Sequence, residues 1–321
     1  MTVSRQDIIE AHKRIEPYIH RTPVLESHLI NEMFGCKFFF KCENFQKIGA
    51  FKIRGGMNAS LQLPKSKLEK GLATHSSGNH AQAIALAAKL LNTKAYIVMP
   101  DNSPAVKVNA VKGYGAEITF CKPTLQARED TMEDVIGRTG AEFIHPFNDE
   151  RIVAGQATAA KELIEEINNL NVIIAPVGGG GLLSGTSLSA KYFGNDIKVY
   201  AGEPEGAADA VLSFKSGKIE SAPYIKTIAD GLLTTLGDIT LAIIRENVTD
   251  ILTVSEEEII NAMRLIYERM KIVIEPSSAV PLAAIIKNID QFKGKDIGVI
   301  LSGGNVDLSN FKEWFKQDNT N

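Results

Sequence analysis

The sequence contains few cysteines. Only three occur in 321 residues, at Cys36, Cys42 and Cys121, and no two of them have the CxxC spacing. An odd number of thiols without that spacing argues against a disulfide framework and against a structural zinc site. We therefore expect a protein of a reducing compartment, the cytoplasm.

Long apolar runs and an excess of charge of one sign are also missing. The longest apolar runs have the length of a strand, well short of a membrane span. The polar residues 1–17 are not typical of a secretory signal. The formal net charge is −3, with both signs interspersed, which gives no electrostatic attraction to nucleic acid or to an anionic membrane. These absences favour a globular protein that binds neither nucleic acid nor a membrane.

Short apolar segments alternate with amphipathic ones along the chain, a pattern that predicts an α/β fold with mostly parallel sheets. The expected strands are residues 37–42, 71–75, 95–99, 117–121, 142–145, 172–177, 198–200 and 297–301. The expected helices are residues 81–91, 106–113, 132–139 and 157–167, and one that runs from the capping box Ser255/Glu258 to about residue 271. Ligands of such folds bind beyond the carboxyl ends of the strands, where the polar or glycine-rich turns 76–80, 178–181 and 302–304 lie.

Four consecutive glycines, residues 178–181, follow the expected strand 172–177 and precede a helix that begins near Leu182. Glycine lets the backbone approach a ligand closely and adopt positive φ, and the helix N-terminus adds partial positive charge. The segment therefore has the features of a phosphate cradle. It lacks the lysine and hydroxyl of GxxxxGK[ST] and the spaced glycines of GxGxxG, which favours a small phosphorylated cofactor over ATP hydrolysis or a dinucleotide.

Three further segments join the glycine run: GAFKIRG at 49–55, SSGNH at 76–80 and LSGGN at 301–305. Together they resemble the fold-type II pyridoxal-phosphate (PLP) enzymes, and most of all the serine racemase and serine/threonine dehydratase branch, from about His20 to Asp307. The resemblance implies two doubly wound α/β domains with the cofactor in the cleft between them. It implies a large domain of residues 1–69 and 149–321, a small mobile domain of residues 70–148, and a homodimer.

The resemblance also assigns the cofactor site. An aldehyde cofactor needs an amine, and Lys52 matches the family's Schiff-base lysine. Asn79 matches the residue that contacts the cofactor O3′ atom. Ser302 matches the residue that faces the pyridine nitrogen, where a hydroxyl does not hold the ring protonated as a carboxylate would. The full implied set is Phe51, Lys52, Asn79, Gly178, Gly179, Gly180, Gly181, Leu182, Gly231 and Ser302.

The turn 76–80 is expected both to cap the following helix through Ser or Asn and to hold the substrate carboxylate. The implied substrate-binding residues are Ser76, Ser77, Asn79, His80 and Arg128. Ser77 matches the second acid/base of serine racemase, on the cofactor face opposite Lys52. Racemisation needs two such groups, whereas dehydration needs only Lys52 to remove the α-proton.

A metal site is implied at Glu203, Asp209 and the carbonyl of Ala207. Two carboxylates with a carbonyl between them suit a hard cation such as Mg²⁺, Ca²⁺ or Mn²⁺ in a structural or activating role. Ser27, Lys47, Gln82, Tyr114 and Asn305 match positions that contact ATP in animal serine racemases. His28 and Ile48 depart from that pattern, which argues against ATP as an effector.

The sequence thus predicts deamination of L-serine and L-threonine to pyruvate and 2-oxobutanoate with release of ammonia, accompanied by serine racemisation. Two alternatives share the same site: a primary serine racemase and a β-hydroxyaspartate dehydratase. A PLP-binding protein without catalysis is disfavoured because Lys52, Ser77, Asn79 and Ser302 are all present. A β-replacement enzyme would need a second nucleophile, and assays with O-acetylserine and sulfide would separate it.

Overall fold

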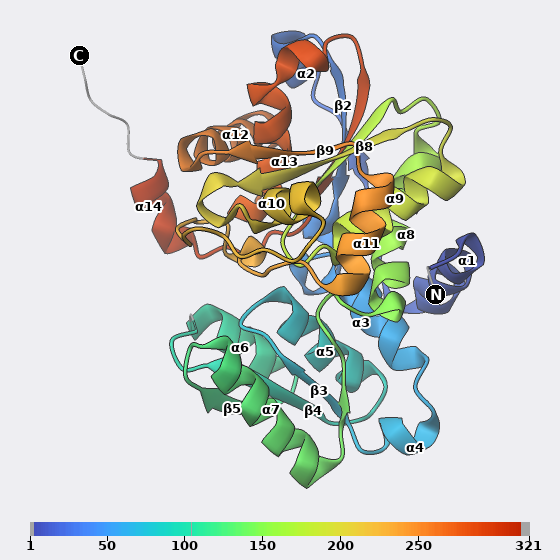
Figure 1. Ribbon diagram of the computed structural model, residues 1–321, viewed down its shortest axis with the longest axis vertical. Helices are drawn as coiled ribbons and strands as arrows, with labels where there is room; N and C mark the ends of the chain where they lie inside the picture. The colour runs from blue at the N-terminus through green and yellow to red at the C-terminus, as the bar shows by residue number, and fades with distance from the viewer. Residues whose placement is uncertain (1–2, 104, 316–321) are drawn as a thin grey trace.

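The computed structural model describes residues 3–103 and 105–315 and contains two β-sheets, one above the other in Figure 1. The six-stranded sheet has the order β1-β2-β10-β7-β8-β9, and the four-stranded sheet has the order β5-β4-β3-β6. Every pairing is parallel except β1 with β2. The predicted α/β class with parallel sheets is confirmed.

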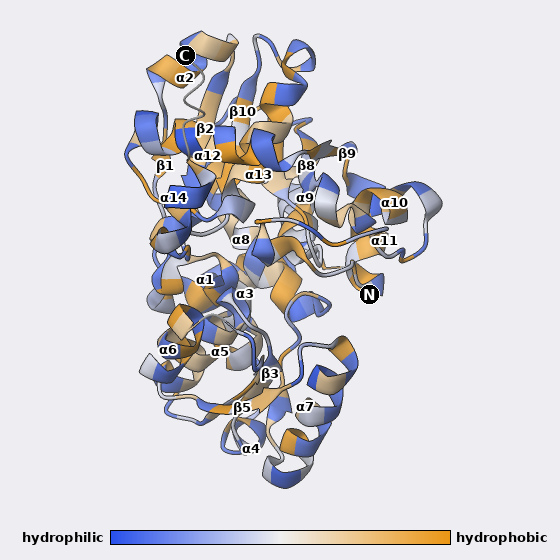
Figure 2. Ribbon diagram, turned by 90° about the vertical axis from the view of Figure 1, so that its left-hand side faces the viewer, coloured by the Kyte–Doolittle hydropathy of each residue, from blue (hydrophilic) through white to orange (hydrophobic). Residues whose placement is uncertain are grey.

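Helices cover both faces of the six-stranded sheet, and its central strands are mostly apolar and buried, as expected for a parallel sheet between two helical layers. Hydrophobic residues of β2 and β10 pack against α12 and α13 (orange in Figure 2). The strands are β1 (Val24–Leu25), β2 (Lys37–Cys42), β7 (Val172–Pro176), β8 (Lys198–Pro204), β9 (Asp250–Val254) and β10 (Asp296–Leu301). One face carries α2 (His28–Phe34), α12 (Glu256–Met270) and α13 (Pro276–Lys287), and the other carries α8 (Glu150–Glu166), α9 (Gly181–Phe193), α10 (Asp209–Ser216) and α11 (Asp238–Asn247).

The four-stranded sheet is built from β3 (Leu72–His75), β4 (Ala95–Pro100), β5 (Glu117–Cys121) and β6 (Glu142–Phe143). Helices α3 (Lys52–Leu61), α5 (Asn79–Leu90) and α6 (Ala105–Gly113) pack on one face, and α7 (Leu125–Thr139) packs on the other. All four strands fall within the residues predicted for a small domain. The domain boundaries themselves stay a prediction, and residues 1–2, 104 and 316–321 of those ranges lie outside the described residues.

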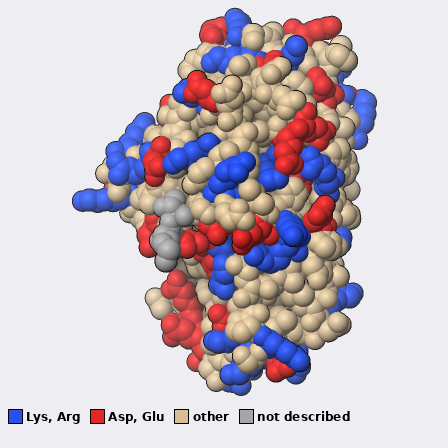
Figure 3. Space-filling model, turned by 90° about the vertical axis from the view of Figure 1, so that its right-hand side faces the viewer, with Lys and Arg blue, Asp and Glu red and all other residues tan. Residues whose placement is uncertain are grey.

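The remaining elements are short or peripheral. They are α1 (Arg5–Ile15), α4 (Lys65–Leu68), α14 (Phe311–Trp314) and the 3-10 turns η1 (Glu16–Tyr18), η2 (Glu43–Phe45), η3 (Lys47–Gly49), η4 (Glu205–Ala207), η5 (Asp230–Leu232), η6 (Ile289–Gln291) and η7 (Leu308–Asn310). No helix in the part of the chain that the structure describes is long and apolar enough to cross a membrane. Acidic and basic side chains are interspersed over the face seen in Figure 3.

Two helices begin earlier than predicted from the spacing of their hydrophobic residues, because a side chain caps each of them at an earlier position. Thr124 accepts a hydrogen bond from the Ala127 amide at 3.2 Å and opens α7 at Leu125. Asp149 accepts one from the Arg151 amide at 2.8 Å and opens α8 at Glu150. The predicted capping box of Ser255 and Glu258 at the start of α12 is confirmed.

The turn before α5 does not cap that helix through Ser or Asn, so this prediction is wrong. The N-cap residue is Gly78, which has no side chain to donate or accept, and Asn79 is already the first residue of the helix. The Ser76 hydroxyl instead accepts a hydrogen bond from the Gly78 amide at 3.2 Å, within the turn. The side chains of Ser77 and Asn79 are therefore not used in helix capping.

Candidate active site

The turns predicted to carry the site come together at the carboxyl ends of the strands. The turn 76–80 follows β3, residues 178–181 follow β7 and residues 302–304 follow β10. An isolated antiparallel bridge joins Ala50 to Gly303, and the Phe51 amide donates to the Ser302 carbonyl at 3.0 Å. Lys52, at the start of α3, is thereby held beside the end of β10.

Lys52 is enclosed by protein. Its Nζ donates a hydrogen bond to the Pro146 carbonyl at 2.9 Å and lies 5.2 Å from the centre of the Phe51 ring. Burial lowers the pKa of Lys52 to about 8, although the nearby Glu275 carboxylate opposes this shift. A larger fraction of neutral amine is therefore present near neutral pH than on a surface lysine, which favours nucleophilic attack on an aldehyde.

The backbone before Lys52 is held in an unusual conformation. Ile48 has a φ of 63°, which is rare for a β-branched residue, and Gly49 has a φ of 69°. The Asn305 side-chain amide donates to the Ile48 carbonyl at 2.7 Å. A β-carbon on Gly49 would lie 2.8 Å from the Asn305 Oδ1 atom. Such strain persists where surrounding contacts over-determine the backbone, as they do here on the approach to Lys52.

Residues 178–181 form a cradle that side chains would fill. Gly180 has a φ of +86°, and a β-carbon there would lie 2.7 Å from Leu236. A β-carbon on Gly179 would lie 2.2 Å from the Phe147 ring. The α9 helix begins at Gly181 without a side-chain cap, so its first amides are free for an anion. This geometry fits the predicted phosphate-binding role.

Two serines meet at the end of β10. The Ser302 hydroxyl lies 3.1 Å from the Ser278 hydroxyl, and both side chains are buried. Ser278 also donates to the Gly303 carbonyl and accepts from the Gly303 amide, each at 2.7 Å. No carboxylate is bonded to Ser302 among the described contacts, so the residue predicted to face a pyridine nitrogen lies in a neutral, hydrogen-bonding environment.

Asn79 is fixed by two partners that reach it from distant parts of the chain. Its Nδ2 donates to both Glu275 carboxylate oxygens, at 3.0 and 3.1 Å, and its Oδ1 accepts from Asn305 Nδ2 at 2.8 Å. Burial, and next the charge of Asp230, raise the pKa of Glu275 to about 7. A buried carboxyl group that titrates near neutrality beside Lys52 and Asn79 is a further candidate functional residue.

Of the other predicted substrate-binding residues, Ser76, Ser77 and His80 lie in one turn, whereas Arg128 does not. Ser76 and Ser77 are half-buried in the turn, and His80 is buried with Nε2 at 3.1 Å from the Ile144 carbonyl. Burial lowers the pKa of His80 well below its ordinary value, so its ring is neutral. Arg128 Nε donates to the carbonyl of Thr124, the N-cap residue of its own helix, at 3.4 Å, and among the described residues no hydrogen bond joins Arg128 to the turn.

Gly231 and Leu182 also lie at the cradle. The Gly231 amide donates to Ser277 Oγ at 3.1 Å, and a β-carbon on Gly178 would lie 2.9 Å from Leu232. Leu182 is buried in the first turn of α9. Residues 231 and 232 therefore pack against the glycine turn 178–181.

The predicted metal ligands form a separate buried pair. The Glu203 carboxylate accepts amides from Ala210 at 2.6 Å and from Val211 at 2.9 Å, and Asp209 Oδ2 is buried without a partner. Burial raises the pKa of Glu203 to about 8 and that of Asp209 to about 7. An unpartnered oxygen beside a second carboxylate and the buried Ala207 fits a divalent cation. Among the described residues no three acidic, His or Cys side chains gather for a metal, so backbone or water oxygens would complete this site.

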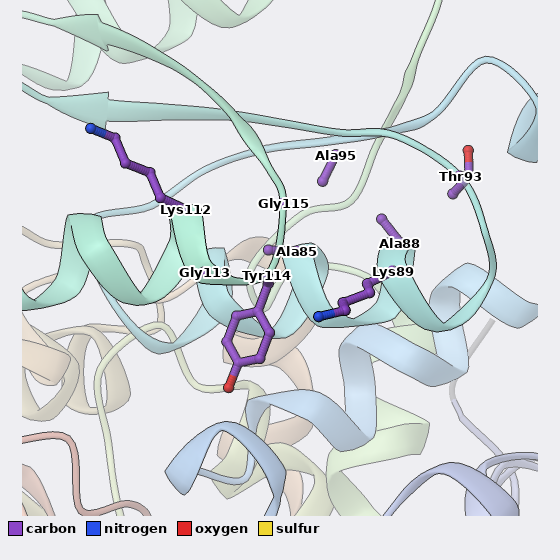
Figure 4. A pocket seen from close by; sticks show the side chains of 9 residues that line it. All are labelled: Ala85, Ala88, Lys89, Thr93, Ala95, Lys112, Gly113, Tyr114 and Gly115. Atoms are coloured by element: carbon purple, nitrogen blue, oxygen red, sulfur yellow. The ribbon is translucent and has the colours of Figure 1, made fainter.

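The residues that match ATP-contacting positions lie in different elements and have different partners. Ser27 caps α2, Gln82 is buried in α5, Lys47 lies in η3, and Asn305 is bonded to Ile48 and Asn79. Tyr114 lies at a hollow of about 320 Å³ in the smaller sheet's layer (Figure 4). Ala85, Ala88, Lys89, Thr93, Ala95, Lys112, Gly113, Tyr114 and Gly115 line it. None of the lining residues belongs to the turns around Lys52.

Sequence reasoning missed Glu275, Ser278 and Phe147. Each reaches the site from a segment that carried no recognised motif, and only the Glu-Pro pair at the start of α13 was a local signal. The ring of Phe147 packs edge to face against the ring of His145, with 4.7 Å between the ring centres. Its packing against Gly179 and the Lys52–Pro146 contact place the segment after β6 at the centre of the site.

A buried amine, a glycine cradle at a helix N-terminus and a neutral serine pair are the chemical parts that an aldehyde cofactor with a phosphate group requires, and the residues present fit PLP. The fold and these parts define a fold-type II PLP enzyme. Residues 15–303 match the family model "Pyridoxal-phosphate dependent enzyme", and the chain belongs to this family.

Individual relatives match over nearly the whole chain. The serine racemase of Dictyostelium discoideum is 52% identical over 318 residues, covering 97% of this chain and 98% of that protein. A beta-hydroxyaspartate dehydratase of Paracoccus denitrificans is 49% identical over 303 residues, covering 94% and 96%. The crystal structure of the Dictyostelium serine racemase superposes with a TM-score of 0.91 at 53% identity, covering 96% of this chain and all of that one. This protein is therefore a PLP-dependent enzyme.

Proposed function

We propose that this enzyme deaminates L-serine and L-threonine to pyruvate and 2-oxobutanoate, and that it also racemises serine. The β-hydroxyl leaves as water, and a water molecule then hydrolyses the unsaturated product and releases ammonia, so that the net loss is ammonia alone. The observation that carries the proposal is the enclosed Lys52 amine, with its lowered pKa, whose charge reaches His80 in the turn that also offers Ser76 and Ser77. The relatives named serine racemase support the racemase component.

In this proposal PLP, once bound, supplies the electron sink that makes the α-proton of an amino acid acidic. The amides at the start of α9 would hold its phosphate, and Ser302 would offer a neutral hydroxyl to its ring nitrogen. Asn79, held by Glu275 and Asn305, would bond its O3′ atom. Lys52 Nζ would remove the α-proton, the turn 76–80 would bind the substrate carboxylate, and Ser77 Oγ would be the second group that returns a proton.

The racemase component is tested by replacing Ser77 with alanine. We expect S77A to lower D-serine formation from L-serine by about 100-fold or more, since one of two proton-transfer groups is lost. Pyruvate formation, which needs only Lys52 at the first step, should fall far less. Both products are measured in the same reaction, by chiral chromatography and by a coupled pyruvate assay.

The remote hydroxyl of Ser216, exposed at the end of α10, provides a control, and S216A should keep both rates. If S77A lowers the two products in equal proportion, Ser77 is a binding group and not the second acid/base. If the unaltered enzyme forms D-serine faster than pyruvate, racemisation is the primary activity. Failure to form either product would overturn the proposed function.

We also propose that Glu203, Asp209 and the Ala207 carbonyl bind Mg²⁺, Ca²⁺ or Mn²⁺. The unpartnered Asp209 Oδ2 and the second buried carboxylate support this site. Two buried acids without a cation are unfavourable, so occupancy should stabilise the fold.

At a Mg²⁺ concentration near 100 times its Kd, we expect the melting temperature to rise by roughly 5 °C. Glu203→Gln should abolish this increase, as measured by differential scanning calorimetry with Mg²⁺ and with EDTA. Glu205 lies two residues away and pairs with Lys287 at 2.9 Å on the surface, so Glu205→Gln should keep the response. Equal responses in both variants would place the cation elsewhere.

The proposed assembly is a homodimer and the proposed location the cytoplasm. Phe45 and Val273 are about half exposed, and Asn44 Nδ2 bonds the Val273 carbonyl at 3.2 Å, so the two apolar side chains belong to adjoining segments that a second copy would cover. All three cysteines are buried free thiols, which suits a reducing compartment.

A β-hydroxyaspartate is the second candidate substrate. The 49% identity to the Paracoccus enzyme supports it, and the same proton removal by Lys52 would start its dehydration. Parallel assays with L-serine, L-threonine and 3-hydroxyaspartate rank the three substrates.

A further inference from the structure

A lysine from the smaller sheet's layer reaches across the mouth of the site. Lys107, in α6, forms an ion pair with Asp230, in η5 of the larger part. The Lys107 side chain is 15% exposed and that of Asp230 is 45% exposed, so the pair lies at the rim and not in the core. Sequence reasoning did not single out either residue.

The ammonium group of this pair lies next to the turn proposed to bind substrate. A β-carbon built on Gly78 would be 3.9 Å from Lys107 Nζ. Asp230 directly precedes Gly231, which packs against the glycine turn 178–181. The charges of both Lys107 and Asp230 also reach Glu275, which holds Asn79. Three separate observations therefore place this cation at the entrance to the substrate position.

An ion pair with one half-exposed partner contributes little free energy, so another carboxylate can replace Asp230 at low cost. Serine and threonine carry one carboxylate, which the turn 76–80 would take, and they leave the pair intact. An amino acid with a second carboxylate brings a competing anion toward Lys107 and meets repulsion from Asp230. The Lys107–Asp230 ion pair can therefore discriminate between monocarboxylic and dicarboxylic substrates.

We propose that Lys107 is a specificity-determining residue, which exchanges Asp230 for the side-chain carboxylate of a dicarboxylic β-hydroxy amino acid such as 3-hydroxyaspartate. The inference rests on the proposed function and names the second substrate class of that site. Arg128 is the other cation predicted near the turn, but its side chain donates to the Thr124 carbonyl at the start of its own helix.

The test compares kcat/KM for 3-hydroxyaspartate and for L-serine in Lys107→Met, Lys107→Arg and Asp230→Asn. Lys107→Met should lower the value for 3-hydroxyaspartate by about tenfold or more, the effect of losing one charge-assisted hydrogen bond, and change that for serine by less than about threefold. Lys107→Arg should restore most of the loss. Asp230→Asn should raise the value for 3-hydroxyaspartate, because a competing and repelling anion is removed.

Lys112, exposed on the same helix, gives the matched control, and Lys112→Met should change neither substrate. The affinities for succinate and for butyrate, measured by calorimetry, compare a dicarboxylate with a monocarboxylate without any turnover. Lys107→Met should weaken the binding of succinate only. The inference is overturned if Lys107→Met affects both substrates equally or neither, or if the unaltered enzyme turns over serine but not 3-hydroxyaspartate. Absence of turnover with every substrate would instead contradict the proposed function, while the succinate measurement would still decide the role of Lys107.

Discussion

Replacing Lys52 with alanine should lower the turnover of L-serine by about 10⁴-fold or more, because the variant loses both the amine that holds the cofactor and the base that removes the α-proton. The purified variant should also lack the absorbance band near 410 nm that a lysine-bound cofactor gives. Visible spectra and single-turnover assays of product measure the two effects independently.

The same substitution should not unfold the protein. Lys52 is an enclosed amine whose hydrogen bond goes to the Pro146 carbonyl, and burial already disfavours its charged form. Removing it should leave the free energy of unfolding unchanged or slightly higher, as is common for residues kept for function. Lys65, 89% exposed at the start of α4, provides the control, and Lys65→Ala should keep spectrum and activity.

A Lys52→Ala variant that kept the 410 nm band would show that another amine holds the cofactor. One that lost the band but kept turnover would contradict a PLP reaction at this site. Reduced activity together with a large loss of stability would indicate that the effect is structural, and Lys52→Arg, which keeps a cation in the same space, would separate that case.

The parts of the site that the sequence could predict are those built from consecutive residues. The glycines 178–181, the Lys52 segment and the turn 76–80 each carry their chemistry within a few positions, and strand ends bring them together. Helix starts were harder, since the caps Thr124 and Asp149 lie several residues before the segments that were predicted to be helical. The expected N-cap at 76–80 was wrong because the cap position is a glycine.

Contacts between distant residues carried no local signal. Glu275 meets Asn79 across 196 positions of sequence, and Lys107 meets Asp230 across 123. Buried charges were equally hidden, because Lys41 and Arg54 look like ordinary solvent-exposed residues until their partners are known. Pairing of this kind depends on which helices the topology brings into contact, and the pattern of a single segment does not contain that information.

The buried charges near the site form a network that ties α3 to α8. Arg54, two residues after Lys52, donates to Glu43 at 2.7 and 2.8 Å and to Glu162 at 2.8 and 2.9 Å. Lys41 donates to Glu162 at 2.7 Å, and all four side chains are at most 1% exposed. Two cations and two anions balance in the interior, where an unbalanced charge is costly.

Replacing Glu162 with glutamine should therefore lower the free energy of unfolding by about 3–5 kcal/mol, as expected when one partner of a buried ion pair is removed. Glu165, one turn along α8, pairs with Arg21 at 3.2 Å at the surface, and Glu165→Gln should cost less than about 1 kcal/mol. Urea unfolding of the cofactor-loaded proteins, followed by circular dichroism, measures both. Similar losses of unfolding free energy in the two variants would mean that the buried ion pairs stabilise the fold no more than a surface ion pair does.

The network also predicts how stability depends on pH. Burial alone would raise the pKa of Glu162, but the charges and hydrogen bonds of Arg54 and Lys41 outweigh it and lower the pKa to about 2, from an ordinary value of 4.5. A carboxyl group with a lower pKa in the folded state binds fewer protons there, so its stabilising effect is complete above pH 4.5 and is lost as the pH falls toward 2. Glu162→Gln should flatten the decline in stability between pH 5 and pH 3, while Glu165→Gln should leave most of it. If the free energy of unfolding of Glu162→Gln declines between pH 5 and pH 3 as steeply as that of the unaltered protein, other carboxylates cause the acid unfolding. The charge of Glu162 would then not be what ties α3 to α8.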